Sequence, residues 1–256
     1  MEIQFGERVV TVPLFFDFGG EVCFRGTVNW EGELKGESMR KVAFWGMVFF
    51  LLVVTVCASG VPLFAKGGKS RLGDRGGESV VPFDYGSDPV RYLENDRVCL
   101  GIDLSIGGAV TYLTDALNGG ENMINSADWG RQIQLSYYSG PVPYVGPNGE
   151  EPAEMWKGLG WNPIQSGDCG GFRSTVVDFK RIGKNKMWVK TIPKLWPNKN
   201  VLAETTFEVL YTLTSDGFTM DATIKNHRSD RTLYPPRSQE MPALYTNGRW
   251  FRLIGY

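Results

Sequence analysis

The chain has 256 residues, with 27 Lys and Arg against 28 Asp and Glu and a single His. A net charge of −1 provides no basic excess to displace counterions, so the composition excludes a general nucleic-acid binder. One His excludes a metal centre built from two or three imidazoles, and the sequence predicts neither a metal nor another cofactor. The 32 Gly and 13% aromatic residues indicate β structure with many turns.

An apolar segment lies near the N-terminus. Arg40 and Lys41 precede an uninterrupted apolar run at 42–56, and Ala58 stands at a plausible cleavage position. A basic start, an apolar middle and a small-residue end are typical of a secretory signal. The run is shorter than the ~20 residues that a membrane-spanning helix needs.

We therefore expect residues 39–58 to be a signal peptide and the mature protein to be secreted or periplasmic. Residues 1–38 are then an over-extended start or a short N-terminal tail. The alternative is a membrane anchor formed by residues 42–58, and such an uncleaved segment is the only membrane contact that we expect. In an exported chain Cys99 and Cys169 either form a disulfide or remain two buried free thiols, and both alternatives stay open.

After this segment the composition predicts a linker and then strands. Residues 59–95 are rich in Gly, Ser and charged side chains, which is typical of a flexible linker. Strand-like patterns begin near residue 96. The first candidate strands cover 98–106, 109–114 and 132–138. Gly and Pro then dominate 140–171, a long irregular stretch of the kind that is often functional.

The clearest strand pattern comes in the later half. Apolar and polar residues alternate over 206–213 and again over 218–224, on either side of Asp216 and Gly217. Period-two alternation around an Asp-Gly turn predicts a β-hairpin. Each of its strands buries one face and exposes the other, as in a β-sandwich.

The whole pattern predicts an all-β fold. A second turn is expected at Asn247-Gly248, and no amphipathic helix of ten or more residues is predicted after Gly60. We therefore expect residues 96–256 to form an antiparallel β-sandwich domain. Because the chain stops at Tyr256 inside a predicted strand, we expect the domain to be truncated at its C-terminus.

Three polar clusters could carry function. In the first, Asp128 and Arg131 flank Trp129, which places hydrogen-bonding groups beside a flat apolar ring. That combination suits a sugar, whose hydroxyls need polar partners and whose ring stacks on indole. The alternative is an Asx-type turn in which Asp128 and Arg131 pair with each other.

The second cluster is the Gly-rich stretch around Trp156 and Trp161. Its glycines allow close approach of a ligand to the backbone, and its indoles offer stacking platforms. It is not a phosphate loop, since it lacks the GxxxxGK[ST] pattern. The alternative is a surface loop pinned by buried tryptophans.

The third cluster contains the candidate catalytic residues. His227 follows a predicted strand, where loop residues often carry function. Glu240 is a candidate general acid or base, with Arg228 or Arg231 to hold a carboxylate or hydroxyl. The alternative for His227 is a solvent-exposed or capping residue.

Four segments in this order resemble one known group of proteins: GIDLSIGGAVTYL, NMINSADWGRQIQLSYY, WNPIQSGD and RTLYPPRSQEMPALYTNGRW. They are similar to segments of secreted bacterial proteins of the galactose-mutarotase-like superfamily, over about residues 98–256. The resemblance implies a curved antiparallel supersandwich with a sugar-binding concave face. It places on or near that face Asp128, Arg131, Gln165, Asp168, Gln239, Glu240 and Asn247. Epimerases of the superfamily use a His pair, whereas this chain has one His, so mutarotase activity is not implied.

These observations lead to one function and two alternatives. We expect an exported carbohydrate-binding protein, an accessory part of polysaccharide degradation, with Trp129, Trp156 or Trp161 stacking on an oligo- or polysaccharide. If the protein is an enzyme, we expect a hydrolase, lyase or epimerase-like activity that uses His227 and Glu240. The alternatives are a non-catalytic structural or interaction protein of the cell envelope, and a truncated relic of a carbohydrate-active enzyme.

Overall fold

The computed structural model describes residues 8–17, 21–24, 27–29, 80–125, 128–230, 232–235, 237–247, 250 and 253–255. The expected signal peptide at 39–58 and the alternative anchor at 42–58 lie outside the described residues, as does most of the expected linker. In the described part of the chain, no helix has the length and apolar character needed to span a membrane.

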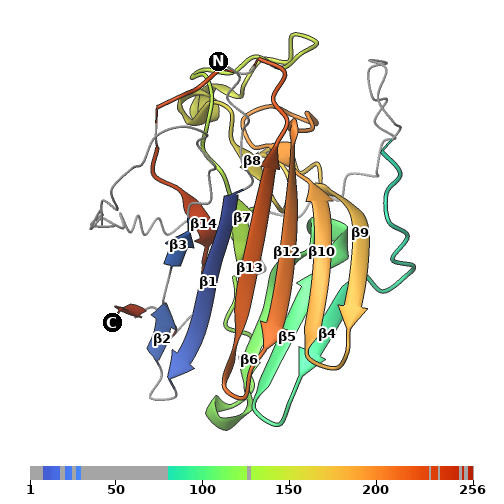
Figure 1. The fold of residues 1–256 in the computed structure, drawn as a ribbon, viewed down its shortest axis with the longest axis vertical. Helices are drawn as coiled ribbons and strands as arrows, with labels where there is room; N and C mark the ends of the chain where they lie inside the picture. The colour runs from blue at the N-terminus through green and yellow to red at the C-terminus, as the bar shows by residue number, and fades with distance from the viewer. Residues whose placement is uncertain are drawn as a thin grey trace, which may run out of the picture. The chain divides into compact units, whose positions relative to one another are not determined.

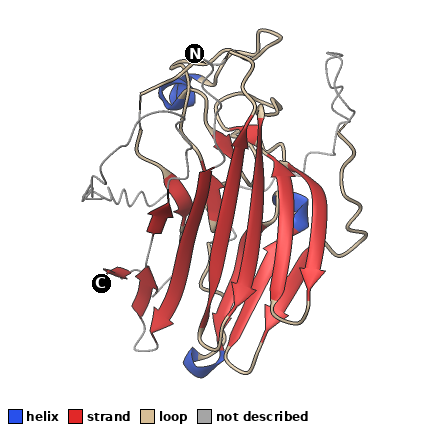
Figure 2. Ribbon diagram, in the orientation of Figure 1, coloured by secondary structure: helices blue, strands red, loops and turns tan. Residues whose placement is uncertain are grey.

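Nearly all regular elements are strands (Figure 2). The strands are β1 (Arg8–Asp17), β2 (Glu21–Phe24), β3 (Thr27–Asn29), β4 (Val90–Glu94), β5 (Val98–Asp103), β6 (Ala109–Asp115), β7 (Gln134–Ser136), β8 (Pro163–Ile164), β9 (Thr175–Ile182), β10 (Lys186–Ile192), β11 (Lys194–Leu195), β12 (Thr205–Leu213), β13 (Gly217–Asn226), β14 (Glu240–Ala243) and β15 (Leu253–Gly255). Three short 3-10 helices are η1 (Leu104–Ile106), η2 (Ala116–Asn118) and η3 (Glu154–Leu159).

The strands form three sheets that make up two layers. The largest has the order β15-β2-β1-β13-β12-β10-β9, with β3 also paired to β1 (Figure 1). The others have the orders β11-β8-β7-β14 and β4-β5-β6, and a bridge between Val110 and Ile133 joins them. Among the described strands every pairing is antiparallel except that of β15 with β2. The prediction of an all-β antiparallel sandwich is confirmed.

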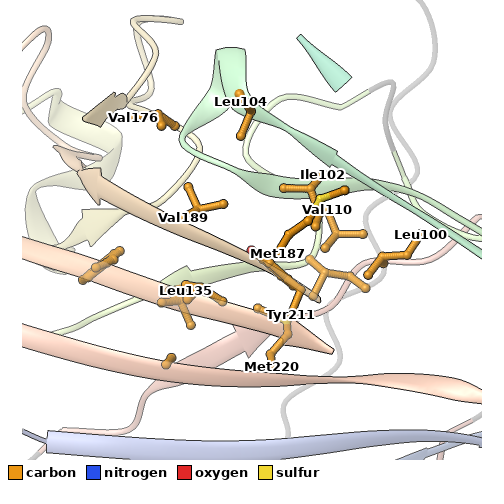
Figure 3. Packing of buried hydrophobic residues seen from close by; sticks show 14 of the residues in the cluster. Leu100, Ile102, Leu104, Val110, Leu135, Val176, Met187, Val189, Tyr211 and Met220 are labelled. Carbon is orange, nitrogen blue, oxygen red and sulfur yellow. The ribbon is translucent and has the colours of Figure 1, made fainter. Parts of the chain in front are cut away.

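The apolar core lies between the two layers. Side chains of β5 and β6 point towards those of β10, β12 and β13 (Figure 3). Strand β12 shows why the sequence folds in this way: Phe207, Val209 and Tyr211 are buried, whereas Glu208 and Leu210 between them are not. Alternation with a period of two turns every second side chain to the core. The hydrophobic effect therefore fixes which face of each strand turns inwards.

Several elements differ in extent from the sequence expectation. The predicted hairpin is present, with β12 and β13 paired from Thr205 opposite Asn226 to Leu213 opposite Phe218. Strand β4 begins at Val90, within the stretch expected to be linker. This strand was missed in the sequence analysis because its apolar pattern is too short to stand out. The hairpin of β9 and β10 was not predicted, although the buried Met187 and Val189 alternate with half-buried residues there.

Cys99 and Cys169 are both free thiols. Burial raises the pKa of each, and a neighbouring carboxylate adds to the effect, from Glu94 at Cys99 and from Asp168 at Cys169. Of the two alternatives considered for these cysteines, the structure has the free thiols, although each is half-buried and not fully buried as expected.

One buried amide joins the three sheets. Gln165, which follows β8, donates through Nε2 to the carbonyl of Gly107 at 3.0 Å and to Tyr211 Oη at 3.2 Å. Its Oε1 accepts from the Leu135 N–H in β7 at 3.1 Å. The Tyr211 hydroxyl in turn donates to the carbonyl of Gly108 at 2.6 Å. These groups are fully buried, so each bond also avoids the cost of an unpaired polar atom.

We predict that Tyr211→Phe destabilises the fold by about 1–3 kcal/mol, because the Gly108 carbonyl loses its donor in a site closed to water. Urea denaturation measures the change. Tyr92→Phe is the control, since Tyr92 is 43% exposed, and it should change stability by less than about 0.5 kcal/mol. Equal effects of the two substitutions would contradict the role given to the buried hydroxyl.

Candidate functional site

The sheet β11-β8-β7-β14 presents one face to the core and a second, polar face away from it. Leu135 and Tyr137 belong to the apolar core. Because side chains alternate along a strand, Gln134, Ser136 and Tyr138 point to the opposite face. We call this opposite face the outer sheet face.

Strand register brings further residues to the outer sheet face. Ser136 lies opposite Ile164 in β8 and opposite Glu240 in β14. Paired residues of an antiparallel sheet share a face, so Asn162 and Ser166, two residues on either side of Ile164, lie there as well. Two contacts support this placement, since Asn162 Nδ2 donates to Ser136 Oγ at 3.2 Å and the Ser166 N–H donates to Gln134 Oε1 at 3.1 Å.

Two tyrosines flank Glu240 at the exposed end of this face. Tyr138 Oη donates to Glu240 Oε2 at 3.3 Å. Burial, with the Glu240 carboxylate adding to it, raises the pKa of Tyr138 to about 12. Burial also raises the pKa of Tyr245, where Glu240 adds to the effect and Arg131 opposes it. Glu240 itself is exposed, so a carboxylate open to solvent stands between two half-buried phenol rings.

The loop Asp128–Arg131 crosses the same face. Asp128 and Arg131 form an ion pair at 3.0 Å. This is the pairing that the sequence analysis gave as the alternative to a sugar-binding role. The Arg131 guanidinium also lies 5.6 Å from the centre of the Tyr245 ring. Both charged side chains stay about half exposed, so the ion pair leaves them open to a ligand.

A pair of indoles continues this surface. The rings of Trp156 and Trp196 meet edge to face with centroids 5.7 Å apart, and both are half-buried. Gly130 packs directly on Trp196, where a Cβ would lie 2.5 Å from the ring. The site is therefore continuous, and we call it the aromatic–polar surface; it comprises Asp128, Arg131, Tyr138, Trp156, Trp196, Glu240 and Tyr245.

Trp129 anchors the loop to the residues that follow β8. Its Nε1 donates to the Asp168 carbonyl at 2.8 Å, and the Arg173 guanidinium lies 5.9 Å from its ring centre. The ring also covers Gly167, where a Cβ would lie 2.9 Å from Trp129 Cζ2. Trp129 therefore offers only part of its ring to solvent.

Asp168 is fully buried, and its carboxylate binds backbone N–H groups instead of facing a ligand. Its carboxylate accepts from the N–H groups of Gly170, Phe172 and Asn200 at 2.8, 3.1 and 2.5 Å. Burial raises the pKa of this carboxyl, while the three N–H donors and Lys194 oppose the rise. Burial lowers the pKa of Lys194, which donates to Asn200 Oδ1 at 2.7 Å. This cluster fixes the two loops that carry Trp129 and Trp196.

Other expected binding residues are engaged within the fold. Trp161 is 1% exposed, because Tyr137 meets it edge to face at 5.9 Å and the Arg228 guanidinium lies 4.8 Å from its ring centre. Gln165 is fully buried between the sheets and Trp161 belongs to the apolar core, so neither lies on the aromatic–polar surface. Gln239 binds both backbone groups of Tyr138, at 2.7 Å each.

The structure does not bring the two candidate catalytic residues together. His227 is exposed at the end of β13, with Nε2 3.1 Å from Thr206 Oγ1. Glu240 belongs to β14, in the other layer, beside Tyr138. Asn247 donates through Nδ2 to the Ile124 carbonyl and so joins two segments that are distant in the chain. Within the described residues, no group of three or more His, Cys, Asp or Glu could hold a metal ion.

Sequence reasoning found three members of the aromatic–polar surface as candidate site residues, Asp128, Arg131 and Glu240, and named Trp156 as a stacking platform. It missed Tyr138, Tyr245 and Trp196. Tyr138 continues the alternation of Gln134 and Ser136, which was a usable signal for its direction. Nothing in the sequence shows that β14 lies beside β7, and that pairing is what unites Tyr138 with Glu240.

Comparisons with known proteins add little. No protein-family model matches the chain, and no curated protein matches it. A solved structure that it resembles weakly is the 4-alpha-glucanotransferase from Thermococcus litoralis, with a TM-score of 0.34 and 15% sequence identity. The match covers 55% of this chain and 23% of that one, so the chain spans less than a quarter of the enzyme. A similarity at this level identifies neither a shared fold nor a shared function.

We predict that an ultraviolet titration of tyrosinate shows a step near pH 12 that is absent from Tyr138→Phe. An unfolded tyrosine ionises near 10, so the stability that this group contributes is complete below about pH 10 and is lost as the pH rises towards 12. Glu240→Gln should move the step to lower pH, because it removes the neighbouring negative charge. Glu151→Gln, at an exposed site, should leave the step unchanged, and a shift of equal size there would contradict the assignment.

Proposed function

We propose that the protein is exported and binds carbohydrate at the aromatic–polar surface. The observation that carries the proposal is the set of half-buried rings of Tyr138, Tyr245, Trp156 and Trp196 beside Asp128, Arg131 and Glu240. Export rests on the order of basic, apolar and small residues over 39–58.

The rings supply the apolar part of sugar recognition. A pyranose has C–H groups on its ring faces that pack on an aromatic surface, and rigid rings gain contact area with little loss of conformational entropy. Trp156 and Trp196 support each other edge to face, and Tyr138 is held by Glu240. Rings fixed in this way need little reorganisation to bind, which favours affinity.

The charged groups supply the polar part. A carboxylate accepts two hydroxyl hydrogens, and a guanidinium donates to two oxygens in a fixed plane. Asp128 and Arg131 balance each other in charge. Glu240 adds one carboxylate, and Arg237, 5.5 Å from the Tyr138 ring centre, adds one guanidinium. The balance of charges favours a neutral glycan over an acidic one.

The competing hypothesis is a non-catalytic interaction protein of the cell envelope. In that case the same rings would be covered by a protein partner rather than by a sugar. The two hypotheses differ in what the purified full chain binds: a glycan array with neutral and acidic polysaccharides gives neutral-glycan signals if the proposal holds. A folded protein that is silent across the array would favour the interaction protein.

We expect Tyr245→Ala and Trp156→Ala to weaken binding of a neutral oligosaccharide at least about tenfold each, measured by isothermal titration calorimetry on the full chain. Matched controls are Tyr92→Ala and Trp188→Ala, since both rings lie on other sheets, in β4 and β10. These controls should bind as the parent does. Equal losses in site and control variants would falsify the placement of the site.

A further inference from the structure

A row of polar side chains lies covered on the outer sheet face, next to the aromatic–polar surface. Gln134 and Ser136 in β7 are each 1% exposed, and Asn162 and Ser166 beside them are fully buried. We call Gln132, Gln134, Ser136, Asn162 and Ser166 the covered polar row. A covered sheet face is normally apolar, because burying polar atoms has a cost that only hydrogen bonds offset.

Three atoms of this row have no partner. Gln132 Oε1, Asn162 Oδ1 and Ser166 Oγ are buried and make no hydrogen bond within the described structure. Most buried polar atoms in folded proteins are paired, so three unpaired atoms on one patch require an explanation. They are two acceptors and a hydroxyl, the groups that would meet the hydroxyls of a sugar.

The loop at 128–131 covers the end of the row formed by Gln132 and Gln134. Gln132 Nε2 donates to the Asp128 carbonyl at 3.2 Å, and Gln134 Nε2 donates to the Gly130 carbonyl. Trp129 lies on Gly167, which directly follows Ser166. Two side-chain amides of the row therefore hold the loop by donating to its backbone carbonyls. The oxygens of a ligand could accept the same two hydrogen bonds in place of these carbonyls.

We propose that the covered polar row is a second polar part of the carbohydrate site, and that the backbone at 128–131 lifts from it when a neutral glycan binds, while the Asp128 and Arg131 side chains remain at the edge of the site. The inference rests on the proposed function and extends it. Sugar oxygens then replace the carbonyls of Asp128 and Gly130 on the amides of Gln132 and Gln134. Sugar hydroxyls also bind Gln132 Oε1 and Ser166 Oγ. The exchange preserves the hydrogen bonds of both amides and satisfies atoms that the free protein leaves unpaired.

Glycine at two positions permits this closed arrangement. Gly130 has a φ of +78° and touches the Trp196 ring, and Gly167 has a φ of +148° beneath Trp129. A side chain at either position would hold the loop away from the sheet. The loop can therefore cover the row closely in the free protein. Two of the bonds that hold it, those from the Gln132 and Gln134 amides, are bonds that a glycan can replace, and the Trp129 indole supplies a further anchor at the Asp168 carbonyl.

The decisive variant is Ser166→Ala, tested on the full chain with cellohexaose, xylohexaose and mannohexaose as probes. It removes a hydroxyl that has no partner in the free protein, so the melting temperature should stay the same or rise by about 2–4 °C. Affinity for the bound hexasaccharide should fall about fivefold or more, because the ligand loses one hydrogen bond. A purely structural serine would not give this combination.

Ser174→Ala is the matched control. Ser174 is also buried, but its Oγ donates to the Ile164 carbonyl at 2.9 Å and accepts from the Lys194 N–H at 2.8 Å. Its loss should lower the melting temperature and leave affinity unchanged. If Ser166→Ala binds the hexasaccharide as the parent does, or loses stability as Ser174→Ala does, the covered polar row is not part of the site.

Hydrogen exchange tests the movement of the loop. Addition of the hexasaccharide should increase amide exchange over 128–131 and decrease it over 134–138. Protection of 128–131 by the ligand would overturn the proposed movement.

The outcomes separate this inference from the proposed function. If Tyr245→Ala weakens glycan binding and Ser166→Ala does not, the result supports the aromatic–polar surface as the site. It overturns the proposal that the covered polar row takes part in binding. A parent protein that binds none of the three probes and is silent on the glycan array overturns both.

Discussion

The hydrogen bonds of Gln165 are the constraint on which the rest of the structure depends. One side chain contacts the turn before β6, the hydroxyl of Tyr211 in β12 and the backbone of Leu135 in β7, so it links all three sheets at one buried point. Apolar packing alone is non-directional and would allow the layers to slide over each other. A fully paired amide has a defined geometry, and it thereby fixes the register between layers. The position of β7 and β8, and with them the outer sheet face, follows from it.

That geometry divides a very short strand between two tasks. In β7 and the residues after it, Leu135 and Tyr137 complete the core, while Ser136 and Tyr138 serve the opposite face. The same alternation that stabilises the sandwich therefore creates the candidate site. Loops complete the surface, and Asp168 holds them through backbone N–H groups instead of contacting a ligand. Core residues and residues of the candidate site thus lie within a few positions of each other, on opposite sides of the same sheet.

The sequence predicts the fold better than the site. The hairpin over 205–226 was predictable, because its alternation and its Asp-Gly turn are local features. The direction of Trp161 and the burial of Gln165 were not, because each depends on a contact with a residue distant in the chain. The pairing of Asp128 with Arg131 was open in the sequence, since four adjacent residues allow either an ion pair or two free groups. Tyr138 and Glu240 are about a hundred positions apart, and only the pairing of β14 with β7 unites them.

The antiparallel pairing of β1 with β13 has a consequence for biogenesis. The pairing runs from Arg8 opposite Ile224 to Phe15 opposite Gly217. In the sequence, β1 precedes the apolar run at 42–56 and β13 follows it. Both strands must be in one compartment to pair. Cleavage after Ala58 would remove β1 from the chain and leave β13 with a row of open N–H and C=O groups, a template for another strand. N-terminal processing would thus decide whether the chain closes this edge of its sheet itself or leaves it open to a partner.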